Sequence, residues 1–244
     1  EYTLVRAPKR GSVELYDAGT FLYTPKENKV GRDSFVFTAT DAAGNVSDEA
    51  TVRVRIVKPT DAATYADLRG KDGEYAAMWL KDSGAFCGER VADRLCFGPE
   101  KTVSRGDFLA AAMHVFGRAP DDAALTSGFA DEREAAAWLR PYLTSALRAG
   151  VIGGTPSDEG LLFRPTAELT RAEAAVIVAK LLELPQDTAQ TVAAMQTGED
   201  AVPTWAAGAA AALQTAGLTL NVAETGAITR LEAAELLYEA AMLE

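Results

Sequence analysis

The chain has 244 residues, of which 48% are hydrophobic and 24% charged, and its formal net charge is −11. This composition is typical of one or two folded domains and excludes a largely disordered chain. The negative charge argues against binding along a nucleic-acid backbone, and the sequence has no run of about 20 apolar residues to span a membrane. Because residues 1–5 resemble a folded strand rather than a signal peptide, we expect the chain to be a piece of a longer protein.

Residues 1–58 show the alternating pattern of β-strands. We expect strands at 12–16, 21–24, 34–38 and 50–57, separated by turn sequences. Four or five short strands are fewer than the seven that an immunoglobulin-type sandwich of about 100 residues contains. We therefore predict a partial β-sandwich whose first strands lie outside this chain, with a linker at 58–61.

From residue 62 onward the pattern is helical, and it repeats. The segments 84–105 and 150–171 align with each other, and 217–230 is a shorter third copy. Each narrow, alanine-rich helix face buries little area, so we expect three helix-loop-helix copies to share one core. The predicted domains are residues 1–58, 62–118, 119–185 and 186–244.

Each copy enters its last helix through a motif with arginine in second place. The motifs are Ser104-Arg105-Gly106-Asp107, Thr170-Arg171-Ala172-Glu173 and Thr229-Arg230-Leu231-Glu232. The hydroxyl and acidic residues predict capping boxes, whereas a cation is unfavourable at the positive end of the helix dipole. Arginine beside helix-terminal amides could bind a carboxylate; alternatively, it pairs with an acidic residue of the neighbouring copy.

Two tryptophans and a glycine pair are further candidates for a ligand site. Trp138 and Trp205 precede corresponding glycines, and they could stack on a sugar ring or anchor the core between copies. The pair Gly153-Gly154 permits close approach of the backbone to a ligand, although it could equally form a plain turn.

The sequence offers little for catalysis or metal binding. His114 is the only histidine and lies in an apolar helical stretch, which argues against a catalytic triad or a multi-histidine zinc site. The acidic residues form no partnered pair of carboxylates, and Asp33, Asp41 and Asp48 are too scattered to predict a calcium site. We therefore expect neither enzymatic activity nor a cofactor.

The three arginine motifs resemble those of S-layer homology (SLH) domains. The second copy is most similar, through Phe129-Ala130-Asp131, Trp138, Gly150-Val151-Ile152-Gly153-Gly154 and Phe163-Arg164-Pro165. The resemblance implies an all-α, pseudo-threefold bundle whose grooves bind secondary cell wall polysaccharide, commonly pyruvylated, with the motif arginine on the acidic group. The carbohydrate-binding residues that it implies are Arg105, Arg171, Arg230, Trp138, Trp205, Asp131, Gly153 and Gly154, and the groove of Arg171 is the first choice.

Residues 11–57 resemble the C-terminal part of a cadherin-like or bacterial Ig-like repeat. Together the resemblances imply an α+β, multidomain, secreted bacterial protein that is anchored non-covalently to the cell wall through an anionic polysaccharide. The alternative is a lattice-forming S-layer protein or an adhesin whose main activity, and any self-assembly, lies further toward the N-terminus. Export favours oxidation, so Cys87 and Cys96 are expected to form a disulfide, with two buried thiols as the alternative.

Overall fold

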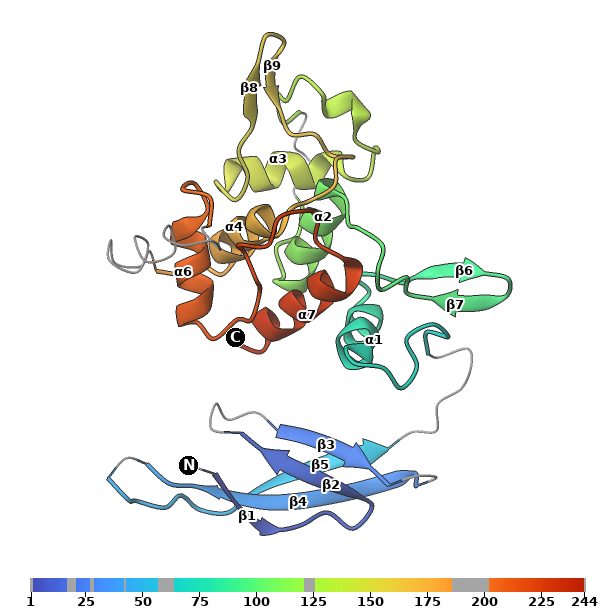
Figure 1. Cartoon of the computed structure of the whole chain (residues 1–244), viewed down its shortest axis with the longest axis vertical. Coiled ribbons are helices and arrows are strands. Elements are labelled where there is room, and N and C mark those ends of the chain that lie inside the picture. The colour runs from blue at the N-terminus through green and yellow to red at the C-terminus, as the bar shows by residue number, and fades with distance from the viewer. Residues whose placement is uncertain are drawn as a thin grey trace. The chain divides into compact units, whose positions relative to one another are not determined.

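The computed structural model describes residues 2–16, 21–26, 29–41, 43–56, 64–120, 126–185 and 202–243. The chain divides into two compact units, Glu1–Thr60 and Asp61–Glu244 (Figure 1). The first unit consists of antiparallel strands and the second is mainly helical, which confirms a mixed α and β chain with its strands in the N-terminal part. The predicted linker at 58–61 lies outside the described residues.

The first unit is built from two small antiparallel sheets. Its strands are β1 (Tyr2–Arg6), β2 (Gly11–Leu15), β3 (Phe21–Pro25), β4 (Gly31–Ala39) and β5 (Ala50–Ile56). One sheet has the order β1-β4-β5, and β2 pairs with β3 in the other. The rings of Phe21 and Phe35 meet edge to face across 5.0 Å, which joins the two sheets through the fully buried Phe35.

Asp33 connects three parts of the first unit. Its carboxylate accepts hydrogen bonds from the amides of Lys9 (3.0 Å) and Arg10 (2.6 Å) and from the hydroxyl of Tyr23 (2.7 Å). Desolvation opposes ionisation, but the hydrogen bonds from Tyr23, Arg10 and Lys9 outweigh it and lower the pKa of Asp33 to about 2. In the described residues, no group of three or more acidic, histidine or cysteine side chains is arranged to hold a metal ion.

The second unit contains three copies of a helical repeat. The first has α1 (Glu74–Ser83), β6 (Glu89–Val91), β7 (Arg94–Cys96) and α2 (Arg105–Val115), and the second has the 3-10 turn η1 (Glu132–Glu134), α3 (Arg140–Arg148), β8 (Thr155–Ser157), β9 (Gly160–Leu162) and α4 (Arg171–Leu181). In the described part of the third copy, α6 (Ala207–Thr215) leads to α7 (Arg230–Ala241) without a hairpin. The hairpins β6–β7 and β8–β9 extend away from the helices (Figure 1).

The buried side chains of the second unit form one continuous core. The motif helices α2, α4 and α7 contact one another in all three pairings. They contribute Leu109, Val178 and Leu237, each no more than 1% exposed. The copies therefore share their apolar interior.

The predicted helix caps are confirmed. Thr170 and Thr229 each accept from the amide three residues later, and the glutamate at that position accepts from the cap's own amide. At α2, Ser104 accepts from the amide of Asp107, but the aspartate side chain instead accepts the Ser104 hydroxyl at 2.7 Å. The shorter acid therefore leaves the box incomplete.

The predicted disulfide is wrong, because Cys87 and Cys96 are free thiols. The strand register places Glu89, not Cys87, opposite Cys96. Between Cys87 and the strand lies Gly88, whose positive φ of 72° turns the chain away from the ladder. Cys87 is exposed and Cys96 half-buried, so the alternative of two buried thiols is wrong as well.

Candidate functional site

The three motif helices start from a common ring of backbone hydrogen bonds. Val103, Leu169 and Ile228 each lie two residues before a motif arginine. The amide of Val103 donates to Ile228 (3.3 Å), that of Ile228 to Leu169 (2.8 Å), and that of Leu169 to Val103 (2.9 Å). Because the three bonds close on themselves, the position of each helix start depends on the other two copies.

The motif arginines also connect one copy to another. The ion pairs are Arg105–Glu173, Arg171–Glu232 and Arg230–Glu89. In each pair, the arginine and the acid belong to different copies, so the three pairs run in a cycle. Of the two roles that the sequence left open, pairing with an acid of the neighbouring copy is the one these contacts show.

The helix-terminal amides are already engaged at two of the three motifs. The amides of Arg105 and Gly106 donate to the carbonyls of Ala167 and Pro165, both at 2.9 Å. The corresponding amides of α7 donate to carbonyls of the first copy in the same way. The hypothesis that free amides assist anion binding is therefore wrong for α2 and α7.

Arg171 lies within a buried ion-pair network. Its side chain is 8% exposed, its Nε and Nη2 lie 2.8 and 2.7 Å from Oε1 of Glu232, and Nη2 also lies 3.3 Å from Oε1 of Glu224. It lines neither of the two grooves described below. The structure thus separates Arg171 from Trp138 and Gly153, with which the sequence had grouped it.

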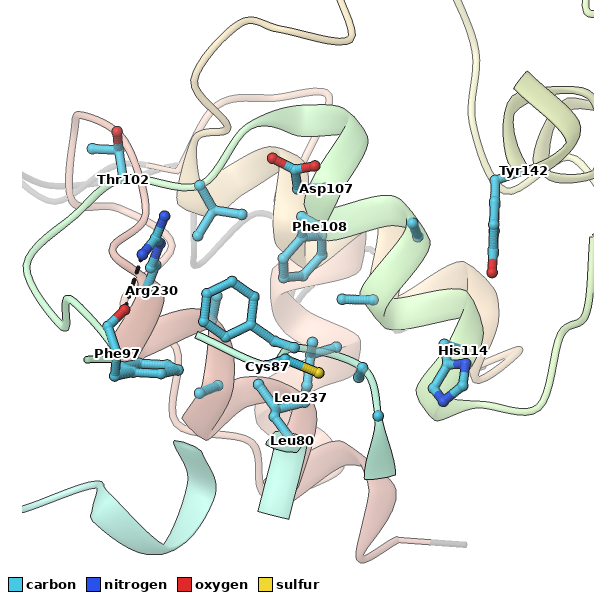
Figure 2. A pocket seen from close by; sticks show the side chains of 18 of the residues that line it. Leu80, Cys87, Phe97, Thr102, Asp107, Phe108, His114, Tyr142, Arg230 and Leu237 are labelled. Carbon is cyan, nitrogen blue, oxygen red and sulfur yellow. Dashed lines mark hydrogen bonds between the residues drawn. The ribbon is translucent and has the colours of Figure 1, made fainter. Parts of the chain in front are cut away.

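The first groove is a cavity of about 440 Å³ to which all three copies contribute. Its lining includes Phe86, Cys87, Phe97, Asp107 and His114 of the first copy, Trp138 and Tyr142 of the second, and Arg230 of the third. In Figure 2, Arg230 and Phe97 lie at one side of this groove, and His114 and Tyr142 lie at the other. The Arg230 guanidinium donates to the carbonyl of Phe97 at 2.9 Å.

The second groove, of about 300 Å³, follows the same plan one copy further along. Its lining includes Ile152, Gly153, Gly154, Phe163, Glu173 and Lys180 of the second copy, Trp205 of the third and Arg105 of the first. The Arg105 guanidinium donates to the carbonyl of Phe163 at 2.7 Å, as Arg230 does to Phe97. Both grooves therefore combine an arginine, a glycine or cysteine loop, an acidic residue and a tryptophan.

The two arginines are held differently. Glu173 reaches Arg105, whereas the shorter Asp107 is bonded to Ser104 and Arg230 pairs with Glu89 of the β6–β7 hairpin. Hydrogen bonds from Lys101 and Arg230, with the positive charge of Arg230, lower the pKa of Glu89 to about 2. Glu89 is therefore ionised at neutral pH.

Aromatic rings complete each arginine site. The guanidinium carbon of Arg230 lies 5.1 Å from the ring centroid of Phe86, and that of Arg105 lies 5.9 Å from that of Phe163. The Nε of Arg105 is buried and has no hydrogen-bond partner within the described residues. These arginines thus have apolar walls that exclude water.

Trp138 and Trp205 are 56% and 61% exposed. A tryptophan that anchored the core would be covered by neighbouring side chains, so the exposure argues against that alternative. Each ring instead lies in the wall of a groove, where a flat apolar surface remains accessible to a ligand.

Asp131 holds the repeat together rather than facing a groove. Its carboxylate is 9% exposed as part of the residue and accepts from the amides of Phe163 (3.0 Å) and Arg164 (2.6 Å). Asp67 makes the same two bonds in the first copy, to the amides of Phe97 and Gly98. The likeness of Tyr65-Ala66-Asp67 to Phe129-Ala130-Asp131 is the sequence signal that could have identified Asp67.

Sequence reasoning missed Lys180 and gave His114 no role in a groove. They occupy corresponding positions near the ends of α4 and α2, and each lines one groove. The His114 ring also donates from Nε2 to the carbonyl of Ser83 at 2.8 Å. Aligning the helices past the motif would have shown that these positions correspond.

Comparisons with known families agree with this architecture. Residues 1–55 match the family model of the bacterial Ig domain, and residues 128–175 match that of the S-layer homology domain. No curated protein matches the chain. The predicted combination of Ig-like and SLH domains is confirmed, whereas the cadherin-like reading has no support.

These matches define the class of the protein. Ig-like and SLH domains are non-catalytic binding or anchoring domains, and an SLH domain indicates a bacterial protein at the cell surface that binds cell wall polysaccharide. Among the described residues, no helix is both long and apolar enough to cross a membrane.

Proposed function

We propose that the helical unit binds a pyruvylated secondary cell wall polysaccharide through its two grooves and so anchors a secreted surface protein non-covalently. The observation that carries this proposal is the repetition of one plan, an arginine between an aromatic wall and an exposed tryptophan, at two places in the unit. A sugar ring would stack on the tryptophan, and its carboxylate would approach the guanidinium.

The proposal includes a pseudo-threefold bundle made of copies 62–118, 119–185 and 186–244, preceded by the β unit of residues 1–58. It is supported by the cyclic hydrogen bonds of Val103, Leu169 and Ile228 and by the cyclic arginine pairs. Under this arrangement a groove needs all three copies, because its arginine, its loop and its tryptophan each come from a different one.

Recognition of an acidic sugar must be local. The chain carries a net charge of −11, so its long-range field repels an anionic polymer. In the second groove, Arg105 and Lys180 place two cations beside the single carboxylate of Glu173. The bound carboxylate would share Arg105 with Glu173 and take up the remaining positive charge of Lys180.

A pull-down of the chain with purified wall polysaccharide tests this proposal. We expect the native polymer to retain the chain and the same polymer, after mild acid removal of its pyruvyl groups, to retain much less. A Tyr75→Ala variant is the control, because Tyr75 is an exposed aromatic residue that lines neither groove. Equal retention by both polymers would contradict recognition of the carboxylate, and no retention by either would contradict wall anchoring.

A further inference from the structure

A third cavity, of about 520 Å³, lies between the Thr64–Arg69 segment and the β6–β7 hairpin, away from both grooves. Its lining residues are Thr64, Ala66, Arg69, Arg90, Asp93, Arg94 and Leu95. Three of these side chains are guanidinium groups and only one is acidic. A concentration of positive charge is unexpected in a chain of net charge −11.

The backbone around this arginine pocket is firmly held. The amide of Ala66 donates to the carbonyl of Leu95 at 2.8 Å, which fixes the segment against β7. Asp67 binds the amides at the end of the same strand. Ala92 and Asp93, both at positive φ, form the tight turn that places Arg90 and Arg94 on adjacent strands.

The positive charge of the arginine pocket is not neutralised by neighbouring carboxylates that could do so. Glu89 is engaged by Lys101 and Arg230, and Asp67 by backbone amides. Within the described residues, Arg90 and Arg94 make neither a hydrogen bond nor an ion pair through their side chains. Both residues are exposed, so their guanidinium donors are available to a ligand.

The second copy provides an internal comparison. It has the same backbone frame, in which the amide of Ala130 donates to the carbonyl of Leu161 at 2.9 Å. The cavity beside its hairpin is lined by more acidic than basic side chains: Asp131, Glu134, Glu159, Arg133 and Arg164. The repeat fold therefore does not require arginines at this place, and those of the first copy call for another explanation.

We propose that the arginine pocket binds a phosphate group, either free or carried by a phosphodiester-linked polymer. Planar guanidinium groups bind phosphate oxygens through paired hydrogen bonds, and several of them neutralise its charge. This site is independent of the polysaccharide grooves, since it shares none of their lining residues.

Backbone amide NMR of the full chain, titrated with inorganic phosphate and separately with a poly(glycerol phosphate) polymer, tests the pocket. We expect saturable shifts in residues 64–69 and 89–96, and at least a tenfold loss of affinity in the double variant Arg90→Gln/Arg94→Gln. Arg133→Gln, which removes an exposed arginine beside the corresponding cavity, should leave the affinity unchanged.

The two titrations distinguish the sources of the phosphate. Tighter binding of the polymer identifies a polymeric ligand, and equal affinity per phosphate identifies free phosphate; both support the pocket. The proposal is overturned if neither probe shifts these residues or if the double variant, with its amide spectrum otherwise retained, binds as the parent does. Trp138→Ala and Trp205→Ala should not change phosphate binding, so failure of the grooves would not be mistaken for failure of this pocket.

Discussion

The two grooves have the same construction and different chemistry. In both, an arginine from one copy lies against the phenylalanine and helix of a second copy and beside the tryptophan of a third. The first groove has Cys87 and His114 where the second has Gly153 and Lys180. The cyclic contacts thus fix where arginine and tryptophan stand, while residues on the loop and helix are free to differ between copies.

This difference has a consequence for ligand preference. The second groove has two cationic side chains and one carboxylate, whereas the first has Arg230, Asp107 and a histidine that is neutral at pH 7 in its ordinary form. We therefore expect an acidic sugar to bind more tightly in the second groove.

The largest expected effect concerns Arg171, which belongs to neither groove. Arg171→Ala should lower the free energy of unfolding of the helical unit by about 3 kcal/mol, because removing one partner of a buried ion pair costs roughly 3–5 kcal/mol and its acids are partly exposed. Urea denaturation measures this. A stable Arg171→Ala variant that has lost polysaccharide binding would instead support the original choice of Arg171 as a ligand residue.

The next effect distinguishes the two tryptophans. Trp205→Ala should weaken binding of an acidic wall polysaccharide by about 2 kcal/mol, roughly thirtyfold, as expected for an aromatic hot spot. Trp138→Ala should have a smaller effect, since it lines the less cationic groove. Calorimetric titration gives both values, and thermal melting should show little change because both rings are more than half exposed. Identical losses would contradict the difference between the grooves.

Exchanging the residues at the end of the motif helices sharpens the comparison. Lys180→His should weaken binding of the acidic polymer about fivefold, or roughly 1 kcal/mol, and His114→Lys should strengthen binding in the first groove by a similar factor. The contribution of Lys180 should also decrease with added salt, because it is exposed. Salt-independent affinity differences would show that charge at this position is not what separates the grooves.

The smallest effect concerns Glu89, which holds Arg230 of the first groove. Because its pKa is lowered from 4.5 to about 2, Glu89 stabilises the fold at pH values above 4.5 and loses this contribution as the pH falls toward 2. The stability difference between the parent chain and Glu89→Gln should therefore shrink between pH 5 and pH 2. Denaturation curves at several pH values measure it, and a difference that grows on acidification would contradict the Arg230–Glu89 pair.

The sequence predicted what depends on neighbouring residues. The capping boxes at Thr170 and Thr229 could be recognised because both partners lie within one helical turn. The partners of Arg105 and Arg230 could not, because Glu173 and Glu89 lie in other copies and are brought close only by the packing of the unit.

Length explains the other omissions. The strands β6 to β9 have three residues each, too few for an alternating pattern to be distinguished from a loop. The grooves escaped prediction for a related reason: each takes its arginine, loop and tryptophan from three copies, so no single stretch of sequence contains one.

The most direct test of the two-groove arrangement is calorimetric titration of the full chain with a short, defined, pyruvylated oligosaccharide of the wall polymer. We predict two sites of unequal affinity, with the tighter one lost in Trp205→Ala, the weaker one lost in Trp138→Ala, and both lost in the double variant. A folded double variant that still binds the oligosaccharide with the affinity of the parent chain would contradict binding in these grooves.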